Sequence, residues 1–202
     1  MSEIYIKRYK EVPVSLGEIY RYAGGGAGDD ALEGEVSACL LKMEGQLSFT
    51  VCYGIFPIER RGEVLSFGFG QTSSRNVHTL LSGCERILLF AATIGAFPDR
   101  MLLKYGSLSP LKALVTNAVG SERVESLCDL FTLEMAKELE KEGCFLTPRV
   151  SPGYGDLPLD FQRTVFEALN PGRHLGVTLN DSLLMWPCKS VTALAGIGKT
   201  EK

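Results

Sequence analysis

The chain has 202 residues and a mass of 22.0 kDa, a length typical of one domain, and its 45% hydrophobic and 22% charged residues are ordinary for a globular protein. Its 21 Lys and Arg against 24 Asp and Glu give a net charge of −3, so it lacks the basic excess with which proteins bind nucleic acid. Apolar runs stay below the ~20 residues of a membrane span, and the charged amino terminus is unlike a secretory signal peptide.

In the first third of the chain, the hydrophobic pattern predicts two helices followed by a hairpin. Residues 15–23 are expected to form a short helix that ends at the glycines of 24–26. A second helix is expected over about 29–47, because its apolar residues follow the 3.6-residue period after two aspartates suited to capping. Segments 48–58 and 64–69 are rich in β-branched and aromatic residues, which predicts that they pair as a hairpin.

The rest of the chain continues as a mixture of helices and strands. The expected elements, in chain order, are a helix begun by Ser73 or Ser74, a strand over 87–94, a short helix over 98–105, a long helix from Ser109-Pro110 to about Glu142, a helix over 160–169 and a last strand over 191–197. Strands and helices do not alternate regularly. We therefore predict an α+β fold in which residues 1–202 form a single domain.

The cysteines point to a reducing compartment. Most lie in apolar stretches, which indicates small core residues of a cytoplasmic protein and argues against a disulfide framework. No pair has the C-x₂-C spacing of a zinc site, and only two histidines are present, so we expect no metal site. The six are Cys39, Cys52, Cys84, Cys128, Cys144 and Cys188.

Two glycine-bearing segments resemble nucleotide-binding motifs but lack essential parts. Segment 193–200 has Ala193 where a P-loop needs its first glycine, and no helix follows it. Segment 68–70 follows an expected strand, but Ser73 occupies the position of the third glycine of a dinucleotide fingerprint. No nucleophile with a neighbouring base is recognisable either, and neither histidine lies in a catalytic motif. We assign no catalytic residue.

Segment 149–159, with the sequence RVSPGYGDLPL, is the most informative part of the chain. Pro152 stiffens its backbone, and its glycines permit positive φ or close approach of a ligand. Arg149 offers a planar fork of donors to a carboxylate or phosphate, and Tyr154 offers an aromatic ring. Two interpretations follow. The loop binds a small zwitterionic ligand, or it is a structural loop whose Arg149 pairs with a neighbouring acid.

The Arg-x-Ser-Pro-Gly-Tyr sequence is followed by Leu179-x-x-Ser182-x-x-Met185-Trp186-Pro187 and then by Ser190-Val191. This order of motifs resembles the activation domain of cobalamin-dependent methionine synthase, above all its short stand-alone relatives. The resemblance is clearest from about residue 73 to 198 and weak over the first 70 residues. It implies a single domain with a twisted, largely antiparallel sheet packed with helices.

The resemblance also implies a ligand and its contacts. Members of the family bind S-adenosylmethionine and support the reductive methylation that returns cob(II)alamin to methylcobalamin. Matched residue by residue, Arg149 corresponds to the arginine that holds the methionyl carboxylate. Ser151, Gly153 and Tyr154 correspond to loop positions that line the ligand.

In the long helix, segment 118–125 matches the family without gaps and places Glu125 at its ligand-binding glutamate. From the residues alone, a helical glutamate is more often a solvated charge, so this assignment depends on the resemblance. We expect Asp156 to orient the loop by accepting hydrogen bonds from backbone amides, and Met185-Trp186-Pro187 to form core and turn rather than site.

The resemblance implies a cytoplasmic accessory protein that acts on a separate cobalamin-dependent methionine synthase or corrinoid protein. That partner would present the cobalamin, and a low-potential electron donor would be required. One alternative is a non-catalytic module that binds or regulates a corrinoid protein and has lost its ligand. Another is an unrelated small-molecule enzyme on the same fold. The family's amino-terminal acidic contact has no recognisable counterpart here, nor do the further strand and helices that carry ligand contacts in its larger members. This leaves the adenine side of the pocket unassigned.

Overall fold

The computed structural model describes residues 3–25 and 29–200, so Gly26 of the expected glycine turn lies outside the described part. The helices are α1 (Leu16–Tyr22), α2 (Asp30–Met43), α3 (Arg75–Leu80), α4 (Phe97–Tyr105), α5 (Pro110–Lys141), α6 (Phe161–Leu169) and α7 (Pro171–Leu175). The strands are β1 (Tyr5–Tyr9), β2 (Phe49–Pro57), β3 (Glu59–Arg61), β4 (Val64–Ser66), β5 (Gln71–Thr72), β6 (Cys84–Thr93), β7 (Cys144–Leu146), β8 (Thr178–Leu179), β9 (Met185–Trp186) and β10 (Ser190–Lys199).

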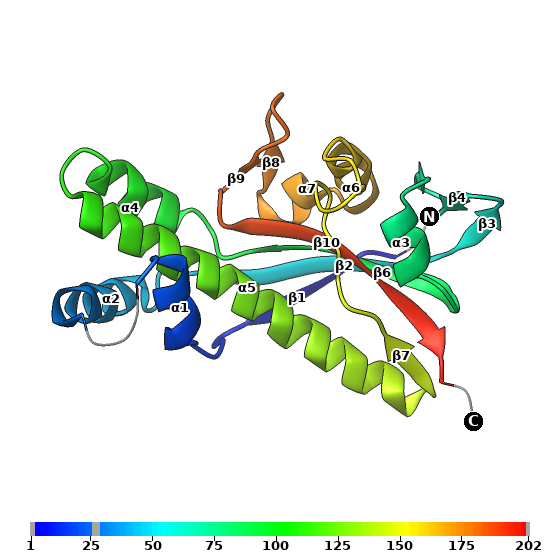
Figure 1. Ribbon diagram of the computed structural model, residues 1–202, viewed down its shortest axis with the longest axis horizontal. Coiled ribbons are helices and arrows are strands. Elements are labelled where there is room, and N and C mark those ends of the chain that lie inside the picture. Colours follow the sequence, from blue (N-terminus) through cyan, green and yellow to red (C-terminus); the bar gives the residue numbers. More distant parts are fainter. Residues whose placement is uncertain (1–2, 26–28, 201–202) are drawn as a thin grey trace.

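A five-stranded antiparallel sheet in the order β1-β2-β6-β10-β7 forms the centre of the molecule. Helix α5 crosses one face of this sheet, and α6 and α7 lie on the other (Figure 1). The two longest strands, β6 and β10, are buried along nearly their whole length because both faces are covered. The predicted α+β fold with a largely antiparallel sheet is confirmed.

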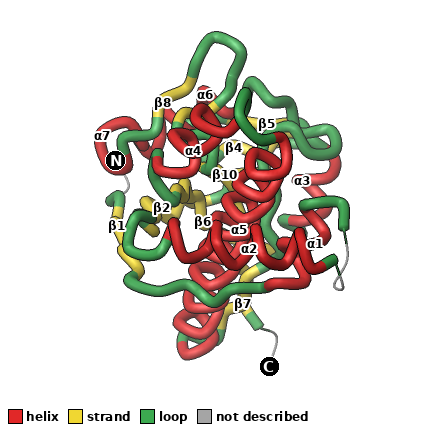
Figure 2. Tube along the Cα trace, turned by 90° about the vertical axis from the view of Figure 1, so that its left-hand side faces the viewer, coloured by secondary structure: helices red, strands yellow, loops and turns green. Residues whose placement is uncertain are grey.

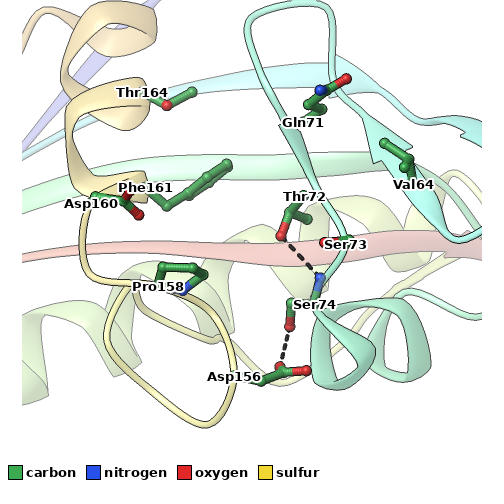
Figure 3. A pocket seen from close by; sticks show the side chains of 10 residues that line it. All are labelled: Val64, Gln71, Thr72, Ser73, Ser74, Asp156, Pro158, Asp160, Phe161 and Thr164. Atoms are coloured by element: carbon green, nitrogen blue, oxygen red, sulfur yellow. Dashed lines mark hydrogen bonds between the residues drawn. The ribbon is translucent and has the colours of Figure 1, made fainter.

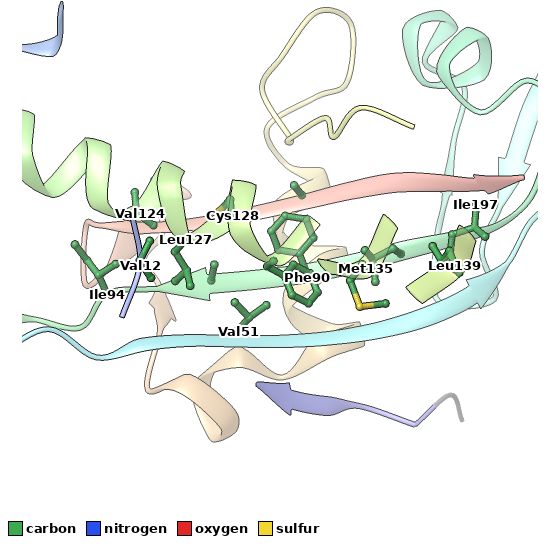
Figure 4. Packing of buried hydrophobic residues seen from close by; sticks show 14 of the residues in the cluster. Val12, Val51, Phe90, Ile94, Val124, Leu127, Cys128, Met135, Leu139 and Ile197 are labelled. Carbon is green, nitrogen blue, oxygen red and sulfur yellow. The ribbon is translucent and has the colours of Figure 1, made fainter. Parts of the chain in front are cut away.

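Alternation along β6 divides its side chains between two cores. Leu88 and Phe90 point into the core under α5, and Ile87 and Leu89 point into the core under α6. Figure 4 shows the first of these cores, with Phe90 facing residues of α5. A third core lies between α1, α2, α4 and the first part of α5, at the left of Figure 1, the side that faces the viewer in Figure 2.

Local signals explain why the predicted helices begin where they do. The side chain of Asp29 accepts hydrogen bonds from the first amides of α2, Ser74 accepts one from Val77 N, and Ser109 caps α5 directly before Pro110. Helix α2 ends at Met43, earlier than expected. Helix α7 was not expected at all.

The predicted hairpin is wrong in its pairing. Strand β2 lies in the central sheet between β1 and β6, whereas β4 pairs with the short strand β3 in a separate small sheet. The turn between β3 and β4 is at Gly62, whose φ is +64°. The physical reason is burial. Strand β2 is apolar along its length and requires partners on both sides, and one of them is β1, whose charged sequence does not look like a strand.

The P-loop-like segment lies within β10 at the middle of the sheet, where Ala193 to Ile197 are buried. Its glycines meet neighbours that a larger residue would displace, since a Cβ on Gly196 would lie 2.6 Å from the Cys84 sulfur. The rejection of this segment as a phosphate-binding loop therefore agrees with its position in the fold.

Candidate functional site

A groove of about 1020 Å³ runs beside β10. Glu125 and Asp129 of α5 form one wall, Gln162 of α6 lies on the opposite side, and the loop that begins at Arg149 lies between them. The hairpin of β8 and β9, which rises beside α6 and α7 in Figure 1, supplies the rim through Trp186. Segments far apart in the sequence are thus brought to one cavity.

Arg149 joins two acids of α5 at the wall of the groove. Its Nη2 donates to Glu125 Oε2 at 2.8 Å and to Asp129 Oδ1 at 2.7 Å. The two acids are four residues apart and so lie on the same face of the helix. The Arg149 side chain is 23% exposed and that of Asp129 is 72% exposed, so the pair with Asp129 is open to solvent and weak.

Burial and charge act in opposite directions on Arg149. Burial alone lowers the pKa of its guanidinium, but the hydrogen bond to Asp129 and the further contacts with Cys128 and Glu125 raise that pKa above its ordinary value. The guanidinium is therefore a permanent cation at the groove. Both of these hydrogen bonds use Nη2, and among the described residues Nε and Nη1 have no acceptor. Arg149 thus retains donors for an anionic ligand.

Hydrogen bonds with β10 hold the site loop in place. Val150 and Leu194 exchange two main-chain hydrogen bonds of 2.9 Å, and Thr147 donates its N–H to Gly196 O at 2.9 Å. Gly196 N donates in return to Thr147 Oγ1 at 2.8 Å. The loop then turns at Gly153, whose φ of +92° favours glycine. Arg149 is therefore carried by backbone that is anchored to the central sheet.

Asp156 fastens the far side of the same loop. Its carboxylate accepts from the backbone amides of Arg75 at 2.7 Å and Asn76 at 3.2 Å, and from the Ser74 hydroxyl. The hydrogen bond from Ser74 is the main reason that the pKa of Asp156 is lowered. Figure 3 shows this contact beside a second, polar cavity of about 380 Å³. The expected bonding of backbone amides is found, but the amides belong to the start of α3.

The structure places four of the five predicted site residues on the groove. Glu125, Arg149, Ser151 and Tyr154 line it, whereas Gly153 shapes the turn behind it. Tyr154 lines the groove and is 71% exposed.

The expectation for Met185-Trp186-Pro187 is wrong in part. Met185 and Trp186 form β9 and line the groove, and Trp186 is 57% exposed rather than part of the core. The reason is that β8 and β9 form a two-stranded sheet of their own, apart from the central sheet.

Two further polar residues of the groove were not recognised in the sequence. Gln162 is 3% exposed, and its Oε1 accepts a hydrogen bond of 2.9 Å from the hydroxyl of Thr192, which is 2% exposed. Both line the groove. In the sequence Gln162 is an ordinary polar residue of an amphipathic helix, and only the packing of α6 against β10 gives it a buried position.

At the start of β10, Lys189 is buried beneath α5. Its Nζ donates to Asn117 Oδ1 at 2.7 Å and to Ser121 Oγ at 2.9 Å, and burial lowers its pKa. The stem of Lys189 lies against Gly120, where a Cβ would come within 3.0 Å of Lys189 Cε. Close packing therefore accounts for a glycine inside this long helix.

The cysteines and acids do not gather into a metal site anywhere in the described part of the chain. Five cysteines are buried and Cys188 is exposed, and all six are free thiols. Among the same residues, no helix is both long enough and apolar enough to cross a membrane.

Comparison with known proteins identifies the fold. No protein-family model matches the chain, and no curated protein matches it either. Among solved structures, the chain is similar to the crystal structure of the MetH reactivation domain bound to AdoHcy, with a TM-score of 0.76 and 17% identity over 100% of this chain and 80% of that one. The chain has the fold of that domain, including the first 70 residues, where the resemblance in sequence is weak. At this identity the likeness establishes the fold alone.

Proposed function

We propose that the protein binds S-adenosylmethionine in the groove beside Arg149 and supports the reductive remethylation of cob(II)alamin on a separate cobalamin-dependent methionine synthase or related corrinoid protein. One observation carries the proposal. The fold is that of a domain whose structure was solved with AdoHcy bound, and in this chain the Arg-x-Ser-Pro-Gly-Tyr loop forms a wall of a groove large enough for such a ligand.

The charges of the groove suit an amino-acid tail. Arg149 contributes one positive charge, and Glu125 and Asp129 contribute two negative charges, so the cluster has a net charge of −1. S-adenosylmethionine has one carboxylate, one ammonium and one sulfonium, with a net charge of +1. We assign its carboxylate to the free donors of Arg149 and its ammonium to Glu125. The exposed ring of Tyr154 offers a cation–π surface to the sulfonium.

The role of this chain in methyl transfer would be to position the donor. Cobalamin on the partner protein, reduced by a low-potential electron donor, would supply the nucleophile that takes the methyl group. No proton needs to move in that transfer, so no general base is required of this chain. Its residues hold the ligand by the amino-acid end, on a loop fixed to β10.

The direct test is titration of the purified protein with S-adenosylmethionine and with AdoHcy by isothermal calorimetry. Trp186 is the one tryptophan of the chain and lines the groove, so its emission provides a second measurement on the same samples. Saturable binding at one site per chain, with a change in tryptophan emission, is expected. Absence of both signals at millimolar ligand would reject the proposal.

The remethylation role needs a separate assay. A methionine synthase lacking its own activation domain would be inactivated to the cob(II)alamin state and incubated with S-adenosylmethionine and a low-potential reductant. Added protein is expected to restore turnover, and the Arg149→Ala variant is expected to restore less.

A second candidate is favoured by one specific contact. Because Arg149 already pairs with Glu125 and Asp129, the chain can be a module that binds a corrinoid protein without a ligand of its own. Association with a corrinoid protein in the absence of any AdoHcy binding would support this candidate over the first.

A further inference from the structure

A hollow of about 370 Å³ lies between the end of α2 and α4, at the left of Figure 1. It shares no lining residue with the groove beside β10. Among the described residues, the charged side chains that line it are Lys42, Arg100 and Lys104, so every charge on its wall is positive. The chain as a whole has a net charge of −3, which makes this local excess of cations notable. We call it the basic hollow.

The three cations of the basic hollow lack acidic partners. Elsewhere Lys7 and Arg149 each pair with two acids. In the part of the chain that the structure describes, no carboxylate lies within salt-bridge distance of Lys42, Arg100 or Lys104. Arg100 and Lys104 are four residues apart on α4, and like charges at this spacing destabilise a helix. The cluster is therefore under a mutual repulsion that a bound anion would relieve.

Helix dipoles account for only part of this cluster. Lys42 lies in the last turn of α2 and Lys104 in the last turn of α4, where a cation is favourable. Arg100 is the fourth residue of α4, near the helix end that disfavours cations. Helix stability therefore explains neither Arg100 nor the convergence of three cations on one hollow.

Two aromatic side chains of α4 hold the cationic groups in place. The guanidinium of Arg100 lies 5.4 Å from the centroid of the Phe97 ring. The Nζ atoms of Lys42 and Lys104 each lie 5.7 Å from the centroid of Tyr105, and Lys42 Nζ also donates to the Tyr105 hydroxyl at 3.4 Å. Such cation–π contacts restrict long side chains, so a ligand has less ordering to impose on them.

We propose that the basic hollow binds the phosphate group of a small soluble molecule. A phosphate monoester carries a charge of about −2 and three acceptor oxygens, so it can accept from donors that converge from two helices. The planar guanidinium of Arg100 can bind two of its oxygens, while Lys42 and Lys104 act as point charges. A single carboxylate has one charge and two oxygens, too few for three cations. The volume of the hollow leaves room for the rest of a small molecule.

Isothermal calorimetry with inorganic pyrophosphate tests the proposal on the unaltered protein, at low ionic strength where charged contacts are least screened. Saturable binding at one site per chain is expected. Succinate, which presents two carboxylates, is expected to bind at least about tenfold more weakly. Absence of pyrophosphate binding at millimolar concentration, or equal affinity for succinate, would overturn the proposal.

Substitution of Arg100, which is exposed, locates the site. Arg100→Gln is expected to weaken pyrophosphate binding at least about tenfold. Lys199→Gln is the matched control, because it also removes one exposed positive charge, at the end of β10 on the other side of the molecule (Figure 1), and it should leave the affinity unchanged. Equal affinities of the two variants would show that pyrophosphate responds to overall charge and would overturn the proposal. Should Arg100→Gln unfold, Lys104→Gln is expected to weaken binding in the same direction.

The proposed function is tested separately, because Arg100→Gln is expected to bind AdoHcy as the wild type does. Lipid headgroups also present phosphate, so a second arm distinguishes the sources. The protein is expected to stay in the supernatant when phosphatidylcholine vesicles containing phosphatidic acid are sedimented, because the hollow is concave and its apolar residue Met101 is only 7% exposed. Sedimentation of the wild type that Arg100→Gln abolishes would assign the phosphate to a lipid and overturn the proposal of a soluble ligand.

Discussion

The Nη2 atom of Arg149 lies 2.8 Å from Oε2 of Glu125, so a loop residue and a helix residue 24 positions apart meet at the wall of the groove. The sequence left two interpretations of Arg149, as a ligand contact or as the partner of a neighbouring acid. The structure shows the pairing with a neighbouring acid, because Arg149 contacts Glu125 and also Asp129. The first stays a prediction, and the groove beside the guanidinium gives a ligand the room that it needs.

Replacement of Arg149 by Ala is expected to weaken binding of S-adenosylmethionine by about 10- to 150-fold, because a charge-assisted hydrogen bond contributes about 1.5–3 kcal/mol. Calorimetry and the emission of Trp186 would both report the change. Arg61→Ala is the matched control, because Arg61 pairs with Glu59 at 3.1 Å on an exposed strand remote from the groove. Equal affinities of Arg149→Ala and Arg61→Ala would contradict the assignment.

Glu122→Gln is expected to destabilise the fold by about 3–5 kcal/mol, because it leaves the buried cation of Arg123 without its counter-charge. Glu122 Oε2 accepts from Arg123 Nε at 2.6 Å, and Oε1 accepts from Ser15 N at 2.8 Å. Urea unfolding followed by circular dichroism would measure the loss. Glu18→Gln, which removes an exposed pair with Arg21, should leave the urea midpoint where it was. A similar small effect of both substitutions would show that the buried pair is not needed.

Replacement of two helical glycines by alanine is expected to change the stability of the protein in opposite directions. Gly34 lies in α2 with open space around it, so Gly34→Ala should stabilise the protein by about 0.5–1 kcal/mol through helix propensity. Gly120→Ala should destabilise it, since the new Cβ would press on the stem of Lys189, whose Nζ is held by Asn117 and Ser121. Thermal unfolding of both variants compares the signs directly. If Gly120→Ala instead stabilised the protein, the Lys189 side chain would have to move aside without loss of stability.

Cys188 is expected to react slowly with alkylating reagents at neutral pH, although it is exposed. Burial of its sulfur, and then the neighbouring carboxylate of Asp99, raise the pKa of Cys188 to about 11. The thiolate is the reactive form, so at pH 8 alkylation should be about 100-fold slower than that of an unhindered thiol with a pKa near 9. Mass spectrometry after iodoacetamide treatment would give the rate.

The pH profile of Cys188 provides the control. Its alkylation rate should rise about tenfold per pH unit and reach no plateau below about pH 10, whereas in Asp99→Asn the plateau should move to lower pH. AdoHcy should slow the reaction because Cys188 lines the groove. A plateau near pH 8.5 in the wild type would contradict the assignment.

Features with local causes were predictable from the sequence. The start of α5 is encoded by a capping Ser109 before Pro110, and α3 begins at Ser74. By contrast, β1 and the pairing of β2 depend on contacts between distant segments. The charged strand Tyr5–Tyr9 becomes a strand because β2 needs a partner at that edge, and no local pattern contains that information.

The residues of the candidate site likewise divide into those that were recognisable in the sequence and those that were not. Arg149 and Tyr154 were recognisable because they belong to a stiff, unusual loop sequence, and the structure places both at the groove. Gln162 and Thr192 were not recognisable, because what distinguishes them is their buried position at the groove and the hydrogen bond between them. Both features arise only when α6 packs against β10.

Helix α5 has 32 residues, and two of its glutamates make contacts on different sides of the helix. Glu122 fastens the chain near Ser15, and three residues later Glu125 faces the groove. One inserted residue between them would swing Glu125 round the axis by about 100° while Glu122 kept its place. Divergent versions of this chain should therefore tolerate changes of loop length elsewhere far better than any change in the number of residues between these two glutamates.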